Sequence, residues 1–173
     1  MLICLTGGGT ALAADASSVK EYQVKAAFVY NFMKFVEWPA KRFDHTNSPL
    51  IIAVAGKSPM FDTLALAIKG RRMNGRELLL KQVATPEAAR AAHVLFVAAG
   101  QDEQLDGWLR EMAGSSVLTV GESETFGKRG GMINFLLESD KVRFEINLDS
   151  ANGEGLQISA QLLKLATTVR RKK

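Results

Sequence analysis

The chain has 173 residues, of which 47% are hydrophobic and 23% are charged. This length and composition fit one globular domain with a proper apolar core, and they exclude an intrinsically disordered chain. The formal net charge of +4 comes from the four basic residues at 170–173, and the rest of the chain is neutral. We therefore expect no nucleic-acid partner.

The first residues resemble an export signal. Residues 1–14 form a short apolar stretch that ends in small residues, and an Ala-Leu-Ala pattern closes at Ala13. We expect cleavage after Ala13 or the next residue, which leaves residues 15–173 as the mature domain and removes Cys4, the single cysteine. No basic residue precedes Lys20, so the signal peptide is expected to be truncated at its start. A tail on a cytosolic protein is the alternative.

The segment from Val19 to Trp38 is predicted to be a helix. Its residues are apolar on all faces but one, so most of its circumference should be covered. Pro39 is expected to end it. The remaining face is a narrow stripe of small or polar residues, namely Lys20, Gln23, Ala27, Asn31 and Lys34.

The middle of the chain alternates short apolar strands with helical patterns. Strands are predicted at 50–55, 77–83, 93–99 and 115–121, and helices at 58–68, 85–92 and 101–112. The strands are continuous apolar runs, which is typical of strands buried on both faces. This alternation predicts an α/β fold: a single-domain three-layer sandwich with a mostly parallel sheet and helices on both faces.

The end of the chain has a different pattern. The segment 141–148 alternates apolar and polar residues, and it follows an apolar strand across Ser139 and Asp140. This pattern predicts a C-terminal antiparallel hairpin with one polar, solvent-exposed face. An amphipathic helix is expected from Leu156 to Arg170.

The sequence carries no recognisable catalytic constellation. Gly56-Lys57-Ser58 follows a strand, but a phosphate-binding loop needs a glycine where Ile51 stands. No serine lies in a Gly-x-Ser-x-Gly turn, and the spacing of histidines and carboxylates matches no metal site. We expect a protein that is not an enzyme and has no cofactor or metal.

Two polar pairs receive a structural interpretation. His93 begins an apolar strand and is expected to be a packed or capping residue, whereas His45 falls in a polar loop. Glu122 and Glu124 are expected to be solvated surface charges in a turn.

Five residues are candidates for binding a partner or ligand. Arg143, Glu145 and Asn147 share the polar face of one predicted strand, where a solvated face is the alternative. Glu37 and Trp38 lie at the end of the first helix, and tryptophan is enriched at interaction hot spots.

The glycine-rich segment 127–131 could also hold an anion on its backbone amides and two cations. A turn that leads into the hairpin explains the same residues, and we favour that interpretation.

Two stretches together resemble the YfiR-like family. They are KAAFVYNFMKFVEWP at 25–39 and GGMINFLLESDKVRFEINLDSANGEGLQISAQLLKLA at 130–166. The resemblance implies a periplasmic regulator that inhibits an inner-membrane diguanylate cyclase by binding its periplasmic region, in cyclic di-GMP signalling and biofilm control. It also implies an outer-membrane lipoprotein that relieves the inhibition.

Some questions stay open at this point. A periplasmic small-molecule receptor or uptake accessory protein is the alternative function, with a ligand near Arg143 or the turn at 127–131. The best-known member of the family carries disulfides, whereas this chain has no cysteine after Cys4, so redox regulation is not carried over. The sequence leaves the oligomeric state open, a homodimer included.

Overall fold

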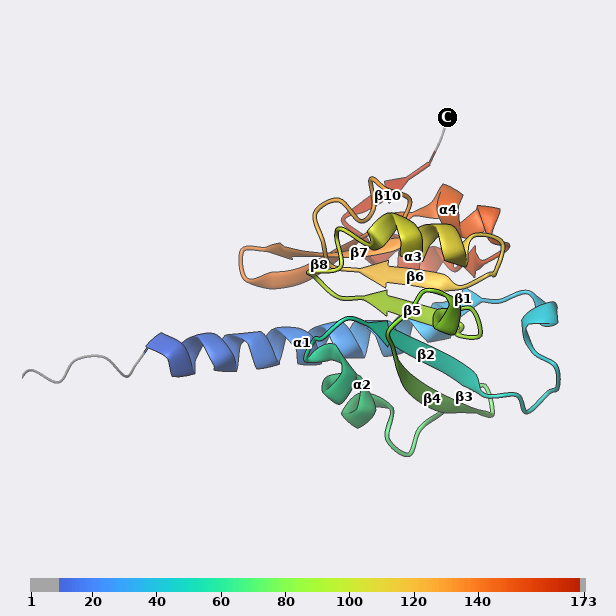
Figure 1. Cartoon of the computed structure of the whole chain (residues 1–173), viewed down its shortest axis with the longest axis horizontal. Helices are drawn as coiled ribbons and strands as arrows, with labels where there is room; N and C mark the ends of the chain where they lie inside the picture. The colour runs from blue at the N-terminus through green and yellow to red at the C-terminus, as the bar shows by residue number, and fades with distance from the viewer. Residues whose placement is uncertain (1–9, 172–173) are drawn as a thin grey trace, which may run out of the picture.

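A long helix begins the described part of the chain and runs beneath a single curved sheet (Figure 1). The structure is a computed structural model that describes the backbone of residues 10–171 and the side chains of residues 16–171. Of the proposed signal peptide, residues 1–9 therefore lie outside the described residues. Helix α1 spans Thr10–Phe35, and within the described residues no helix is long and apolar enough to cross a lipid bilayer.

The main sheet has eight strands in the order β10-β8-β7-β6-β5-β2-β4-β3. The five central strands are mutually parallel: β4 (Arg76–Val83), β2 (Leu50–Ala55), β5 (Val94–Val97), β6 (Leu118–Gly121) and β7 (Ile133–Glu138). The two ends of the sheet depart from this arrangement. Strand β8 (Lys141–Asn147) is antiparallel to β7, β10 (Thr168–Arg170) is parallel to β8, and β3 (Arg72–Met73) is antiparallel to β4.

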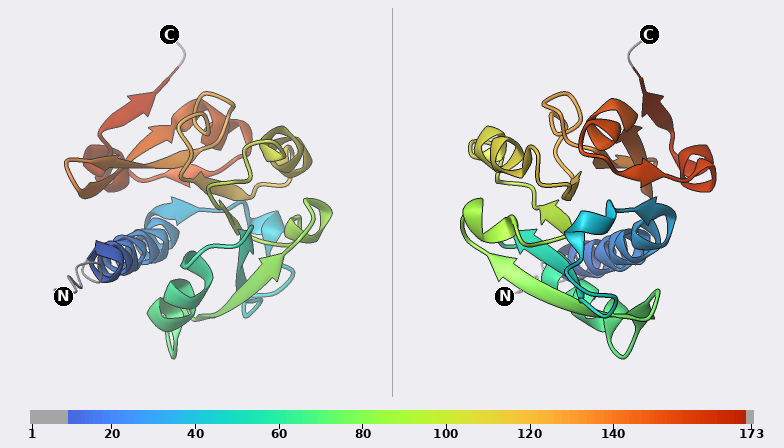
Figure 2. Two further views of the ribbon diagram at one scale, coloured as in Figure 1. Left: turned by 60° about the vertical axis from the view of Figure 1, so that its left-hand side comes forward. Right: turned by 90° about the vertical axis from the view of Figure 1, so that its right-hand side faces the viewer.

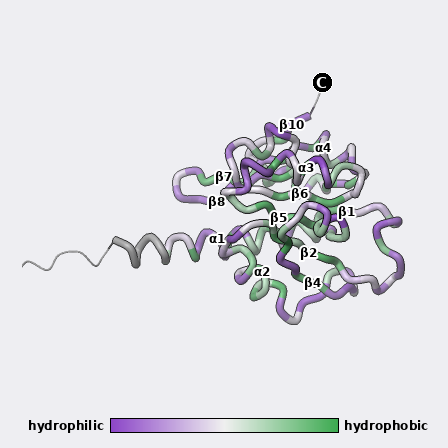
Figure 3. Tube along the Cα trace, in the orientation of Figure 1, coloured by the Kyte–Doolittle hydropathy of each residue, from purple (hydrophilic) through white to green (hydrophobic). Residues whose placement is uncertain are grey.

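Helices cover both faces of the sheet (Figure 2). One face packs against α1 and α2 (Met60–Ile68), with Phe32 and Leu64 fully buried, and α4 (Leu148–Gly153) and α5 (Ala160–Leu165) contribute Ala151 and Leu162 to the same core. The other face packs against α3 (Leu105–Met112), where Trp108 is 1% exposed. Figure 3 shows the hydrophobic residues concentrated along the central strands between these layers. The three-layer α/β architecture predicted from the sequence is confirmed.

The C-terminal part of α1, which lies against the sheet, buries most of its circumference, as its composition predicts, whereas Val19 and Val24 nearer its start are 50% and 44% exposed. The five residues of the predicted polar stripe are all exposed, while Val29 and Phe32 are fully buried against the sheet. The helix ends at Phe35, before the predicted end at Trp38, because Val36–Glu37 forms the short strand β1. Strand β1 pairs with β9 (Gln157–Ile158) in a separate antiparallel ladder.

Two short segments of the chain form single 3₁₀ turns. The predicted helix at 85–92 contains only a single 3₁₀ turn, η2 (Glu87–Ala89), and a second one, η1 (Ala40–Arg42), follows Pro39. The predicted hairpin is present, and Ser139 and Asp140 turn it with φ values of 48° and 60°. Consecutive residues in the left-handed region are what a two-residue hairpin turn requires.

The prediction of a single helix from Leu156 to Arg170 is wrong. The segment forms β9, α5 and β10 in succession. Helix α5 ends at Leu165, and the next residues extend along β8, where the Thr167 amide donates to the Phe144 carbonyl. Edge pairing with β8 thus replaces the predicted helix after Leu165.

One aromatic ring fixes the loop between β6 and β7. Phe126 is 1% exposed and lies between Gly121 and Gly131. A Cβ atom on either glycine would come within 2.3 Å or 2.1 Å of the ring, respectively. The close approach of the ring therefore requires glycine at both positions.

Candidate functional site

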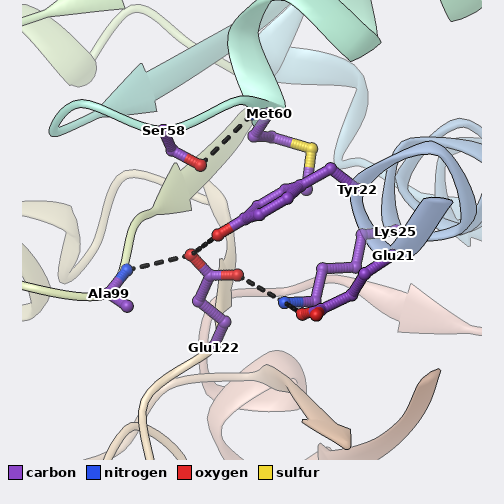
Figure 4. Close-up of polar contacts among 7 residues, drawn as sticks. All are labelled: Glu21, Tyr22, Lys25, Ser58, Met60, Ala99 and Glu122. Carbon is purple, nitrogen blue, oxygen red and sulfur yellow. Dashed lines mark hydrogen bonds and ion pairs between the residues drawn. The ribbon is translucent and has the colours of Figure 1, made fainter. Parts of the chain in front are cut away.

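The carboxyl edge of the parallel strands carries a buried polar cluster (Figure 4). Glu122 directly follows β6, and the Ala99 amide lies just beyond β5. Helix α1 passes across this edge and contributes Tyr22 and Lys25, and Ser58 opens the turn after β2. The cluster therefore joins the helix to three neighbouring strands.

Glu122 is the centre of this cluster. Its side chain is 4% exposed, and its Oε2 accepts from Lys25 Nζ at 2.6 Å. Its Oε1 accepts from the Tyr22 hydroxyl at 3.1 Å and from the Ala99 amide at 3.0 Å. Lys25 also pairs with Glu21 at 2.5 Å. The expectation that Glu122 is a solvated surface charge is wrong, because α1 covers the end of β6.

The surroundings determine the charge states of Tyr22 and Lys25. Burial alone would lower the pKa of Lys25, but its bonds to Glu122 and Glu21 outweigh that effect and raise the pKa. Burial also raises the pKa of Tyr22, and the negative charge of Glu122 adds to it, against a hydrogen bond with Ser58. At neutral pH the lysine is therefore a cation and the tyrosine is uncharged, which are the states that donate to Glu122.

This cluster occupies the place where open α/β sheets bind their ligands. The chain continues from β2 outward to β4 on one side and from β5 outward to β6 on the other, so the strand order reverses between β2 and β5. Ligands of such sheets bind outside the carboxyl ends of the strands at this switch point. Here Tyr22 and Lys25 fill it, and both oxygens of Glu122 have donors within the protein. The arrangement anchors α1 across the strand ends.

A second polar cluster lies at the opposite edge of the same strands. The Trp38 indole donates to the His93 carbonyl at 3.1 Å, and His93 Nδ1 accepts from the Ile51 amide at 3.1 Å. His93 Nε2 lies 3.3 Å from the Arg42 carbonyl oxygen. Burial, together with the positive charge of Arg42, lowers the pKa of His93 to about 4. The interpretation of His93 as a packed residue is confirmed.

The structure separates the five predicted binding residues. Glu37 is exposed beside β9, and Trp38 is partly buried beside His93. Asn147 caps α4 by accepting from the Ser150 amide at 3.1 Å. Arg143 is exposed at the hairpin. These side chains do not form one patch.

Glu145 corrects the prediction of a solvated polar face on β8. It is 8% exposed, and its carboxylate accepts from Arg170 at 2.8 Å and lies 3.5 Å from the Asn134 amide nitrogen. Strand β10 brings Arg170 to it, and a Cβ on Gly127 would approach its Oε1 at 2.6 Å. The turn after β6 and the edge strand β10 cover the face of β8 that the alternation of apolar and polar residues predicts to be solvent-exposed.

The glycine-rich segment 127–131 forms a turn, as favoured from the sequence. The Gly131 amide donates to the Phe126 carbonyl at 2.9 Å, and the Arg129 amide donates to the Thr125 carbonyl at 2.9 Å. The Arg129 side chain pairs with Asp106 at 2.7 Å, on the wall of a hollow of about 530 Å³ beside α3. The Arg129 side chain is thus committed within the protein, whereas Lys128 is exposed.

Arg143 lines a groove that the sequence gives no reason to expect. The N-terminal half of α1 and the β7–β8 hairpin project side by side from the body (Figures 1 and 2). Between them lies a groove of about 450 Å³, here named the α1–hairpin groove, with Val24, Phe28 and Leu137 among its lining residues. Lys20 and Lys141 also line it.

Sequence reasoning missed Glu122 and Lys25, although one signal was present. Lys25 falls outside the polar stripe of α1, on a mainly apolar face where Glu21 one turn earlier is the other charged residue. A charged residue on a face that must be buried requires a buried partner. The partner itself stands 97 residues away, and only the path of α1 across the strand ends reveals it.

Comparison with known proteins gives one family and a structural neighbour. A structure titled a conserved domain protein from Vibrio cholerae O1 biovar eltor str. N16961 superposes with a TM-score of 0.62 at 11% sequence identity. The superposition covers 86% of this chain but 60% of that one, and at this identity it shows a shared fold. The YfiR/HmsC-like family model matches residues 22–167. The match includes most of α1 and the entire sheet up to β8, so the chain belongs to the YfiR/HmsC-like family.

Proposed function

We propose that this protein is a periplasmic regulator that inhibits a membrane-bound diguanylate cyclase by binding its periplasmic region. The observation that carries the proposal is the family match over residues 22–167. Residues 1–14 would direct export, and residues 15–173 would form the mature regulator. An outer-membrane lipoprotein that releases the inhibition belongs to the same proposal.

The arrangement of polar groups supports binding of a macromolecule over capture of a small ligand. The switch point between β2 and β5, where a small ligand would be expected, is filled by Tyr22 and Lys25. The α1–hairpin groove, by contrast, is open and carries three exposed basic residues around apolar ones. A projecting, partly apolar surface of this kind is typical of a protein–protein interaction site.

Deletion of the gene tests the proposed function in a cell that encodes a diguanylate cyclase with a periplasmic region. We expect cyclic di-GMP and biofilm formation to rise severalfold, and the complete gene to restore both. A gene without residues 2–14 should fail to restore them, since the inhibitor would stay on the wrong side of the membrane. Unchanged cyclic di-GMP in the deletion strain would contradict the proposal.

Two of the predicted binding residues differ in how cleanly they test inhibition. Arg143 is exposed, so Arg143→Ala should weaken inhibition without changing stability. Trp38 supports His93, so Trp38→Ala also alters the fold and requires a stability measurement beside it. If folded variants of both residues inhibit normally, the binding site lies elsewhere, with the exposed residues Gln157, Gln161 and Lys164 as the next candidates.

A further inference from the structure

The α1–hairpin groove combines an apolar floor with a basic rim. Val24 is 44% exposed and Leu137 is 56% exposed, and both line the groove, with the partly buried Phe28 between the helix and the sheet. Beneath it Phe28 contacts Phe144 at a ring-centroid distance of 5.3 Å. The groove floor therefore continues the main core to the surface.

The charges around this groove do not balance. Lys20, Lys141 and Arg143 are exposed, and no ion pair joins any of them to another residue in the described part of the chain. Of the two carboxylates along the groove, Glu21 is paired with Lys25, which leaves Asp140 against three cations. The rim is therefore complementary to negative charge.

The basic residues of β8 lie on a part of the strand whose outer edge is not paired with another strand. Strand β10 pairs with β8 only from Glu145 onward, and Thr167 already occupies the Phe144 carbonyl, so Lys141 to Arg143 form an edge of the sheet on the side away from β7. Exposed edges offer unpaired amide and carbonyl groups, and lysine and arginine there keep other strands from pairing. An acidic segment would meet the edge without that repulsion.

We propose that the α1–hairpin groove is the docking site for an acidic amphipathic segment of the partner protein. Its apolar side chains contact Val24, Phe28 and Leu137, and its carboxylates pair with Lys20, Lys141 and Arg143. This inference rests on the proposed function for the identity of the partner, but it specifies the chemistry of the bound segment independently.

Exposed residues elsewhere in the chain supply matched controls. Leu66 on α2 is 73% exposed, so Leu66→Asp introduces the same change as Leu137→Asp away from the groove. Lys81 on β4 is exposed and lies outside the groove lining, so Lys81→Glu is the control for the double variant Lys141→Glu/Arg143→Glu. All five substituted positions are exposed, and thermal unfolding should show that each of the four variants folds.

Two binding partners test the groove and the function separately. The first is a synthetic peptide helix with leucines along one face and glutamates beside them, together with a counterpart in which every glutamate is lysine. The second is the purified periplasmic region of a diguanylate cyclase from the same genome. Binding of both is measured by titration at low and high salt.

With the peptides, we expect the unmodified protein to bind the acidic form at least about tenfold more tightly than the basic form, with the preference weakening in high salt. Leu137→Asp should reduce this binding about tenfold, and Leu66→Asp should not. The Lys141→Glu/Arg143→Glu variant should prefer the basic peptide. Equal binding of the two peptides, or binding that Leu137→Asp leaves unchanged, would overturn the groove assignment.

With the cyclase region, the same groove variants should lose about tenfold in affinity, and the controls should not. If the cyclase region binds but the groove variants bind it equally well, the docking proposal fails while the proposed function stands. If the acidic peptide occupies the groove and the cyclase region does not bind at all, the proposed function fails while the chemistry of the groove stands.

Discussion

The two edges of the parallel strands are closed in opposite ways. At the carboxyl edge, a buried ion pair between Lys25 and Glu122 fastens α1 across the strand ends. At the amino edge, the imidazole of His93 accepts from one backbone amide and lies beside one backbone carbonyl. One closure depends on two charges that are present together, and the other depends on a group that stays neutral.

This difference determines how each edge fails. A buried ion pair is strongly destabilised when only one partner is removed, because the other charge stays buried without compensation. A buried neutral histidine is destabilised by protons, which favour the unfolded state where the ring ionises freely. The carboxyl edge should therefore be sensitive to substitution, and the amino edge should be sensitive to acid.

Removal of Glu122 should give the largest effect. We expect Glu122→Ala to lower the free energy of unfolding by about 3 kcal/mol, the low end for breaking a buried ion pair, because it leaves the Ala99 amide without its acceptor and leaves the buried Lys25 with Glu21 alone as its carboxylate partner. Chemical denaturation measures the loss. Glu124→Ala is the matched control, since Glu124 is exposed two residues away, and it should change stability by less than about 0.5 kcal/mol.

A double variant distinguishes the contribution of the ion pair from that of the space its two side chains fill. Replacing both partners by apolar residues, as in Lys25→Met/Glu122→Leu, should recover part of the stability lost in the single variant. If Glu122→Ala and Glu124→Ala unfold at the same denaturant concentration, the ion pair does not hold the helix, and the contrast between the two edges disappears.

Acid should weaken the amino edge by a smaller amount. The pKa of His93 is about 4 in the folded protein, whereas a histidine in the unfolded chain has a pKa of 6.5. The unfolded chain therefore binds the proton first as the pH falls. Stability should therefore be constant above pH 6.5 and decrease toward pH 4 by about 2 kcal/mol, less than a fully water-excluded ring would give.

Substitution of each histidine separates this contribution from the rest of the chain. His93→Gln should remove most of the decrease between pH 6.5 and pH 4, because an amide still donates and accepts but does not titrate. His45→Gln should retain it, since His45 lies in an exposed loop. An unchanged slope in His93→Gln would show that other groups carry the acid sensitivity.

The smallest effect should come from the hydroxyl of Tyr22. Tyr22→Phe removes one of the two donors to Glu122 Oε1, and the Ala99 amide remains. We expect a loss of about 1 kcal/mol, which corresponds to a decrease in melting temperature of about 2–4 °C. Tyr30→Phe is the control, because its hydroxyl has no hydrogen bond within the described residues, and it should melt close to the unmodified protein.

The sequence predicts the architecture well because its signals are local. The buried strands are continuous apolar runs, and all five residues of the polar stripe of α1 are exposed. The C-terminal segment shows the limit of such signals. Leu165 is an apolar residue of the amphipathic helix predicted from Leu156 to Arg170, yet it is 61% exposed, because edge pairing with β8 ends the helix there.

The candidate site is predicted less well because its contacts are distant in the sequence. Arg143 is correctly expected to be exposed, but the groove beside it depends on how far α1 and the hairpin project together. The side chains of Glu122 and Glu145 are both buried, and each is covered by an element from another part of the chain. A local pattern of polar residues in the sequence does not show that a distant segment will bury them.

The ring of Phe126 restricts how this protein can change over time or by design. Because Gly121 and Gly131 both touch it, a side chain gained at either position must expel the ring or be accompanied by a smaller residue at 126. The three positions therefore behave as one unit of variation. Glu122 follows Gly121 directly, so a change that moves Gly121 would also move the carboxylate that anchors α1. Redesign of the loop therefore has to keep Gly121, Phe126 and Gly131 or replace all three together.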